Sequence, residues 1–507
     1  MLSAIAAEVC RGHSSSSLGS EGPNLKDQEK EHGVLMSTKQ QQKRTGRGGQ
    51  ANRPGRPVPC PVPGGADAIE SAGNEVQPKL TTSCDATLLT HQLMERVVDP
   101  SNMNKAYQRV VSNKGAAGID GMTVNDLRGW IDANKERLLM SLRDGTYKPE
   151  TIRGVQIPKP SGGVRQLGIP TVVDRMVQQA MAQVLEPLLD PLFSESSFGF
   201  RPKRGAQDAL CQASRYVADG YMYVVDIDLE KFFDRVNHDI LMSRLARHVK
   251  DKRFLRITRA FLNAGMMQDG VCIRRSEGTP QGGPLSPILS NLLLDDLDKE
   301  LERRNHKFCR YSDDCNIYVC SLAAGERVMQ SIRRFLERKL KLTVNTAKSA
   351  VDLCHRRKFL GFRLGEGGTL HISPESLCRF RNQICRLTRR NQGKAFEQVI
   401  ERLNSYLVGW FAYYRDGCRP SLLQRLDGWM RRKLRCYRLK QCKRPIGISR
   451  FLQSLGVPEW RAWILALSGK GWWRISLAWQ SAEAMNIAWF RKMGLVSLSA
   501  KAGAVSI

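Results

Sequence analysis

Several features that define common classes of protein are missing from this sequence. No apolar run in its 507 residues approaches the roughly 18 residues that a membrane-spanning helix requires, so we expect no membrane association. The 14 cysteines form no Cys-x-x-Cys pair, and all eight histidines lie at or before His371. This spacing argues against a zinc module and, in a chain of this length, against a disulfide framework.

Acidic residues are also scarce relative to basic ones. The chain has 49 Asp and Glu against 79 Lys and Arg, a formal net charge of +30. Such self-repulsion is tolerated most easily when a polyanion neutralises it, so nucleic acid is the first partner to consider. The N-terminal segment MLSAIAAEVCRGH lacks a basic leader and contains Glu8, unlike a secretory signal. We therefore expect a soluble, cytoplasmic protein.

Charge and composition divide the chain into segments. Residues 1–85 are rich in Ser, Gly, Gln and Pro, carry a net charge of +1, and are predicted to form a disordered or loosely structured extension. Residues 375–507 contain 25 Lys and Arg against seven Asp and Glu, a net charge of +18, which leaves +11 for the region between. Pro374 and Pro445 mark predicted boundaries. The predicted folded segments are therefore 86–374, 375–445 and 446–507.

Hydrophobic periodicity predicts helices alternating with strands between residues 150 and 365. The segment 171–190 has apolar residues at helical spacing, and Thr171 with Asp174 resembles a capping box at its start. The segment 221–229, YMYVVDIDL, is short, β-branched and aromatic, which is typical of a buried strand. This alternation indicates an α/β layer.

Two acidic sites stand at the ends of predicted strands. Asp226 and Asp228 share one face of their strand, because side chains alternate along it. The segment 307–319, KFCRYSDDCNIYV, predicts a hairpin that holds Asp313 and Asp314 at its tip. Phosphoryl transfer by two divalent cations requires carboxylates from separate strands, and these sites supply them. A solvated hairpin tip is the alternative for the Asp pair, and the residues alone do not choose between Asp226 and Asp228.

The order of several motifs resembles that of reverse transcriptases, and of group II intron enzymes in particular. Tyr311-Ser312-Asp313-Asp314 is similar to their Tyr-x-Asp-Asp motif, although the group II pattern usually has Ala in place of Ser312. Similar blocks lie at 113–121, 157–180, 278–301 and 358–362. The resemblance covers residues 90–507 and implies a bacterial-type right-hand polymerase of the α/β (α+β) class. Fingers and an antiparallel palm sheet would precede an α-helical thumb or maturase region and a small helical DNA-binding domain.

The resemblance implies a site for two Mg²⁺ ions, which prefer oxygen ligands. In the family's first metal-binding motif the catalytic Asp precedes an aromatic residue by five positions, as Asp228 precedes Phe233. The residue five positions after Asp226 is Lys231, so the resemblance favours Asp228. The implied catalytic and metal-binding residues are Asp228, Asp313 and Asp314.

The resemblance also implies a site for a deoxynucleoside triphosphate. Phe233 would stack on the sugar and exclude a 2′-hydroxyl, while Lys348 would assist the departure of pyrophosphate. The remaining implied nucleotide-binding residues are Lys159, Arg165 and Gln281. From the residues alone, Phe233 is also compatible with a core aromatic, and the three cations with ordinary surface residues.

The basic C-terminal part interleaves cations with aromatic residues and resembles the thumb and maturase-specific region of the family. This mixture suits RNA, because cations neutralise phosphate and flat rings stack on unpaired bases. The implied RNA-binding residues are Arg431, Arg432, Lys433, Arg435, Arg438, Lys440, Lys443 and Arg444. Trp410, Tyr413 and Tyr414 have helical spacing, which favours a core stripe as much as base stacking. The Trp-rich segment 446–507 resembles the family's DNA-contacting end, and the endonuclease domain of some relatives is not expected.

These resemblances lead to a functional prediction. We expect an RNA-directed DNA polymerase that binds its parent group II intron RNA, assists its splicing and copies it into DNA during intron mobility (retrohoming). Its partners would be the intron RNA, a DNA target and primer, and deoxynucleoside triphosphates, in a ribonucleoprotein associated with the bacterial nucleoid. The alternatives are a maturase-only RNA-binding protein with a decayed polymerase site, and a domesticated reverse transcriptase used in host repair or defence.

Overall fold

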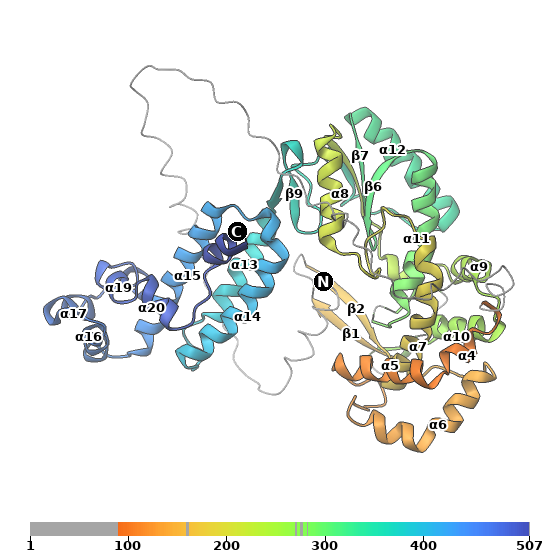
Figure 1. The fold of residues 1–507 in the computed structure, drawn as a ribbon, viewed down its shortest axis with the longest axis horizontal. Helices are drawn as coiled ribbons and strands as arrows, with labels where there is room; N and C mark the ends of the chain where they lie inside the picture. The colour runs from red at the N-terminus through yellow and green to blue at the C-terminus, as the bar shows by residue number, and fades with distance from the viewer. Residues whose placement is uncertain (1–89, 159–161, 269–270, 274–276, 281, 506–507) are drawn as a thin grey trace, which may run out of the picture.

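The structure is a computed structural model that describes residues 90–505, except 159–161, 269–270, 274–276 and 281. The predicted N-terminal extension lies outside the described residues. Within them, no helix combines the length and the apolar character needed to cross a bilayer. Figure 1 shows the sheets and their covering helices on one side of the molecule and an all-helical region on the other.

The fingers combine helices with a four-stranded sheet of order β2-β1-β4-β5. The helix α7 (Val172–Leu189) is largely buried and packs against the N-terminal helices α4 and α5 and against α11 (Ser286–Arg303). It begins after Thr171, whose hydroxyl accepts the N–H of Asp174 at 3.1 Å, as the sequence predicts. The other elements are α4 (Leu93–Val97), α5 (Pro100–Ser112), α6 (Leu127–Arg143), β1 (Ile152–Pro158), β2 (Val164–Ile169), β4 (Met266–Gln268) and β5 (Val271–Ile273).

The palm is an antiparallel sheet of order β6-β7-β3-β8, which confirms the predicted class. Alternation sends Val225 and Ile227 into the core that includes α11 and α12, and sends Val224 and Tyr318 into the core that includes α8. Both faces of the sheet are therefore covered. The elements are α8 (Ala206–Ala218), β3 (Tyr223–Ile227), α9 (His238–His248), α10 (Lys252–Asn263), α11 (Ser286–Arg303), β6 (Lys307–Tyr311), β7 (Asp314–Val319), α12 (Leu322–Phe335) and β8 (Ala350–Leu353).

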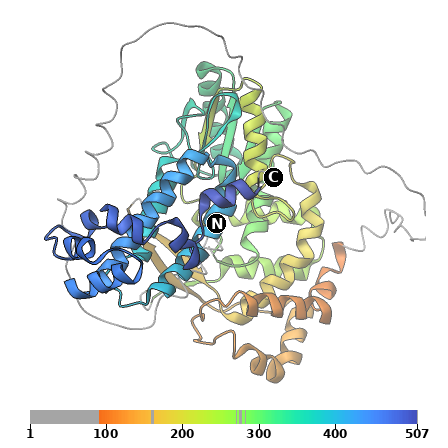
Figure 2. The same ribbon diagram turned by 60° about the vertical axis from the view of Figure 1, so that its left-hand side comes forward.

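The C-terminal region is helical and shares a core with the palm. Figures 1 and 2 show α13 to α15 beside the palm and the short helices α16 to α20 at the far end of α15. One continuous apolar cluster includes Val224 of the palm, Trp410 of α14 and Phe490 of α20. The buried core thus crosses both predicted boundaries, which remain predictions. The elements are β9 (Phe362–Leu364), β10 (Leu370–Ile372), α13 (Pro374–Leu387), α14 (Phe396–Tyr414), α15 (Pro420–Gln441), α16 (Pro445–Ser454), α17 (Glu459–Ala466), α18 (Trp472–Ile475), α19 (Trp479–Ala484), α20 (Ile487–Lys492) and α21 (Leu498–Val505).

Candidate functional site

The register of the palm sheet brings the two acidic sites together. Asp226 pairs with Asn316 and Ile227 pairs with Cys315 across the antiparallel strands β3 and β7. The same register, continued by one residue, sets Asp228 opposite Asp314. Partners in an antiparallel pair lie on the same face, so both carboxylates emerge on one side at the end of the sheet.

The hairpin between β6 and β7 forms the predicted tip. Tyr311 pairs with Asp314, so Ser312 and Asp313 make a two-residue turn. Ser312 adopts φ +61°, in the left-handed region that favours glycine. Its hydroxyl is buried and has no hydrogen-bond partner in the described part of the chain. The turn that carries the carboxylates is therefore a strained element that its surroundings must hold in place.

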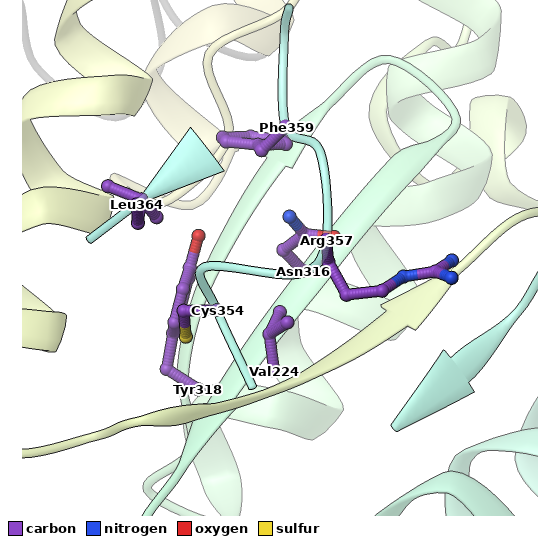
Figure 3. Close-up of a pocket in the computed structure, with 7 residues that line it drawn as sticks. All are labelled: Val224, Asn316, Tyr318, Cys354, Arg357, Phe359 and Leu364. Carbon is purple, nitrogen blue, oxygen red and sulfur yellow. The ribbon is translucent and has the colours of Figure 1, made fainter. Parts of the chain in front are cut away.

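Asp226 and Asp228 differ in their partners. Asp226 Oδ2 accepts hydrogen bonds from Arg357 Nε at 3.0 Å and Nη2 at 2.5 Å. Figure 3 shows Arg357 next to Asn316 at the edge of a small cavity on this face of the sheet. Asp228 Oδ2 lies 3.3 Å from Nζ of Lys348, a side chain that is 63% exposed. Asp226 thus has a counter-ion that donates two hydrogen bonds to one of its carboxylate oxygens, whereas the partner of Asp228 is a solvent-facing lysine that can exchange for another cation.

The electrostatics of the cluster favour a cation. Desolvation and repulsion from Asp313, Asp226 and Asp228 raise the pKa of Asp314 to about 7. Among the residues with described side chains, no group of three or more His, Cys, Asp or Glu is close enough to hold a metal ion. The donor chemistry fits Mg²⁺, but the carboxylates would have to move closer together around it.

The predicted nucleotide-binding residues are only partly described. Lys159 and Gln281 lie outside the described residues. Arg165 is exposed on β2 of the fingers hairpin, opposite Ile157. Phe233 is 8% exposed and packs edge-on against Phe232 with ring centroids 5.1 Å apart. These are the contacts of a core aromatic, and a role for Phe233 toward a nucleotide sugar stays a prediction.

The predicted RNA-binding run divides into two groups along α15. The guanidinium of Arg432 lies 3.8 Å from the ring centroid of Trp473, and that of Arg438 lies 4.4 Å from the ring of Phe451. Arg435 Nε donates to the backbone carbonyl of Met485 at 3.0 Å. These half-buried cations hold the short C-terminal helices against α15, and Arg431 and Lys433 are also half-buried. The exposed members are Lys440, whose Nζ still lies 5.2 Å from the ring centroid of Trp472, and Lys443 and Arg444, which follow the end of α15.

The aromatic residues of α14 form a core stripe, one of the two alternatives that their spacing allows. Trp410 is 7% exposed and Tyr414 is 5% exposed. The Tyr413 hydroxyl donates to the backbone carbonyl of Leu360 at 2.9 Å. These rings therefore pack the thumb against the palm, and the buried rings of Trp410 and Tyr414 are not available to stack on bases.

Arg357 and Arg310 are site residues that sequence reasoning does not find. Arg357 meets Asp226 across 131 residues of sequence, so no local spacing relates them. Arg310 is fully buried behind the hairpin turn and bonds to the carbonyl of Ser312. The position of Arg310 next to the Tyr-x-Asp-Asp motif is the one signal in the sequence that could point to it.

Comparisons with known proteins agree with this arrangement. Residues 157–364 match the family described as reverse transcriptase (RNA-dependent DNA polymerase), and residues 377–454 match the group II intron, maturase-specific domain. The chain is 31% identical to protein YkfC of Escherichia coli (strain K12), over 57% of this chain and 88% of that protein. It is 34% identical to the group II intron-encoded protein LtrA of Lactococcus lactis subsp. cremoris, over 44% of this chain and 37% of that protein.

A solved structure titled partial Cas6-RT-Cas1--Cas2 complex is 25% identical over 49% of this chain and 43% of its own chain, with a TM-score of 0.33. The chain spans most of YkfC but little more than a third of LtrA.

Proposed function

The chain belongs to the family of group II intron-encoded reverse transcriptases and maturases, and on that premise we propose that it is an RNA-directed DNA polymerase that binds its parent intron RNA, assists splicing and copies the intron into DNA. The observation that supports the proposal is the register of β3 and β7, which pairs Ile227 with Cys315, so that Asp228 and Asp314 are the next residues along the two strands, with Asp313 in the adjoining turn. All three lie within the residues that match the reverse transcriptase family. The second match covers the basic helices.

We propose that Asp228, Asp313 and Asp314 hold two Mg²⁺ ions. When bound, the ions would lower the pKa of the primer 3′-hydroxyl and stabilise the leaving pyrophosphate. The chain fixes Asp228 through its backbone, whose N–H donates to Ser349 Oγ at 2.9 Å and whose carbonyl accepts the N–H of Asn345 at 2.8 Å. Lys348 neutralises Asp228 in the free protein and would turn toward the triphosphate once the carboxylate has a cation.

The residues proposed to bind the nucleotide, the RNA and the DNA follow from the chemistry of their side chains. Arg165 from the fingers would reach the triphosphate together with Lys159, and Phe233 and Gln281 would face the sugar and base. The exposed cations at the end of α15 would neutralise phosphates of the intron RNA. DNA target and primer would meet the segment from 446 to 507. We propose a cytoplasmic, nucleoid-associated ribonucleoprotein.

The test is incorporation of labelled deoxynucleotides on an annealed RNA template and DNA primer with Mg²⁺. We expect Asp228→Ala to reduce the rate by about 10³-fold, because several kcal/mol of charge stabilisation are lost. Asp352→Asn is the matched control, since Asp352 lies on the neighbouring strand β8, where its Oδ1 lies 3.6 Å from Arg356 Nη1 and accepts the N–H of Leu353 at 2.7 Å. Full activity of Asp228→Ala would refute the assigned site.

Binding of structured intron RNA separates the alternatives. Asp313→Ala should lose synthesis and keep RNA affinity, because Asp313 lies in the palm hairpin turn and is not one of the exposed cations proposed to bind RNA. An inactive wild type that binds the RNA tightly would favour the maturase-only alternative. Active polymerisation without intron RNA ends flanking the gene would favour the domesticated enzyme.

A further inference from the structure

A fully buried ion pair lies behind the turn that carries Asp313. Arg310 and Asp298 both have 0% exposed side chains. Arg310 Nε donates to Asp298 Oδ1 at 2.7 Å, and its Nη2 donates to Oδ2 at 2.6 Å. Asp298 belongs to α11, so this two-pronged contact fixes the guanidinium plane relative to a long, buried helix.

The remaining donors of the same guanidinium reach the hairpin turn, the helix α11 and the loop that contains Ser197 and Gly199. Nη1 donates to the backbone carbonyl of Ser312 at 2.9 Å and to Asn291 Oδ1 at 3.0 Å. Nη2 donates to Ser197 Oγ at 2.7 Å. An arginine has five N–H donors in one rigid plane, so this side chain sets the position of the Ser312 carbonyl relative to α11.

The neighbouring loop supports the turn directly. A Cβ placed on Gly199 would lie 2.3 Å from the backbone nitrogen of Ser312, so the two backbones touch and a larger residue would displace the turn. The carbonyl of Gly199 accepts a hydrogen bond from Asn291 Nδ2 at 2.9 Å. Phe198 and Arg310 are also joined, through N–H to carbonyl at 2.9 Å. The loop of Ser197 and Gly199, the helix α11 and the hairpin turn are thus joined by hydrogen bonds into one polar unit.

The unit lies on the face of the sheet opposite the carboxylates. Arg310 pairs with Cys315 in the hairpin, whereas Asp314 pairs with Tyr311, and successive residues of a strand point to opposite faces. Arg310 therefore does not touch a substrate. It acts on the strained backbone of Ser312, which immediately precedes the two acids.

We propose that Arg310 is a positioning residue, which holds the Ser312 carbonyl from behind so that Asp313 and Asp314 are directed toward Asp228, and thereby sets the affinity of the site for divalent cations. The inference rests on the proposed function, because it concerns the same carboxylates. A net gain in stability does not explain the pair, since buried ion pairs are often no more stabilising than apolar residues of similar volume.

The test compares Arg310→Lys with Arg244→Lys in the full chain. Lysine keeps the charge but has no planar fork, so it cannot hold Asp298 and the Ser312 carbonyl in the same geometry. Arg244 is a matched control, because its largely buried side chain, 19% exposed, pairs with Asp296 of the same helix α11 at 2.6 Å but has no hydrogen bond to the turn or to the loop of Ser197 and Gly199 in the described part of the chain.

Two readouts do not depend on catalysis. Hydrogen exchange of a peptide containing residues 311–314 is measured without divalent cations, and Mn²⁺ binding is measured by electron paramagnetic resonance with primer–template and a chain-terminated primer. Arg310→Lys should exchange faster in this peptide and bind Mn²⁺ about tenfold more weakly, the size of effect seen when groups that orient metal ligands are removed. Arg244→Lys should leave both unchanged.

Equal Mn²⁺ affinity and equal exchange in Arg310→Lys and wild type would overturn the inference. If Arg310→Lys does not fold, the double variant Arg310→Met with Asp298→Leu replaces it, because this variant leaves no unpaired buried charge. Weak Mn²⁺ binding in a folded double variant supports the inference, and wild-type affinity overturns it. Failure of wild-type polymerisation would reject the proposed function separately, since exchange and Mn²⁺ binding are read without turnover.

Discussion

Buried and half-buried arginines have different partners in the palm and in the helical C-terminal half, which comprises residues 375–507. In the palm, Arg310 and Arg201 are buried against the carboxylates of Asp298 and Asp190. In the C-terminal half, Arg432 and Arg438 lie over aromatic rings. A ring attracts a cation without neutralising it, so the C-terminal half can build its interior from basic residues and keep a net charge of +18 for a polyanion.

The largest effect should come from removing the carboxylate of the palm pair. Asp298→Leu leaves Arg310 buried without a counter-ion and should lower the free energy of unfolding by about 3–5 kcal/mol. Urea denaturation measures this loss. Adding Arg310→Met to the same variant should restore most of it, and failure to do so would mean that the carboxylate acts through packing.

A buried carboxylate without an arginine provides a second test. Asp174 accepts hydrogen bonds from Tyr147 Oη at 2.7 Å and from Thr171 Oγ1 at 2.8 Å, and burial raises its pKa to about 6. A raised carboxyl pKa makes ionisation unfavourable in the folded state. Relative to Asp174→Asn, wild type should therefore lose on the order of 2–3 kcal/mol as the pH rises from about 4 to 7. Denaturation curves across this range check the sign, and parallel curves would contradict it.

The ring contacts of the C-terminal half should be individually weaker. Trp473 lies under both Arg432 and Lys433, with the Lys433 Nζ 4.8 Å from the ring centroid. Trp473→Phe keeps a ring but weakens the attraction, and should lower the free energy of unfolding by about 1 kcal/mol. Leu477→Ala is the control, because Leu477 is 60% exposed on the same segment. An equal loss in the control would show that the ring contact contributes nothing specific.

The smallest effect is expected at the turn. Ser312→Ala removes a buried hydroxyl that has no partner among the described residues and should stabilise the chain by up to about 1 kcal/mol. Ser312→Gly should stabilise it at least as much, since glycine also accepts the positive φ. A destabilised alanine variant, measured by thermal denaturation, would indicate that the hydroxyl is bonded.

Local patterns predict the parts of this fold that local chemistry determines. The alternation of 221–229 and the turn within 307–319 are sufficient to predict β3, the hairpin and the shared face of Asp226 and Asp228. They do not reveal which acid is already paired, because Arg357 reaches Asp226 only after the chain has folded. From the sequence, only the family resemblance favours Asp228 over Asp226 as the metal ligand.

The basic run of α15 is a case in which composition predicts more free surface than the folded chain has. Its composition predicts a surface for RNA, and its exposed end is compatible with that prediction. Sequence does not reveal that Arg432, Arg435 and Arg438 are occupied by the helices that follow, because those contacts depend on tertiary packing. An estimate made from the density of basic residues in the sequence is therefore larger than the basic surface that is free for a ligand.

The apolar core shared by the palm and the helical half links binding to catalysis through folding cooperativity. Val224 of the palm and Phe490 of α20 belong to one buried cluster, so the two halves should melt together. Any RNA that binds only the folded helices then raises the population of the folded palm by mass action. An intron transcript that captures the protein would in this way protect the sheet carrying Asp228 against unfolding and proteolysis, before any deoxynucleotide is present.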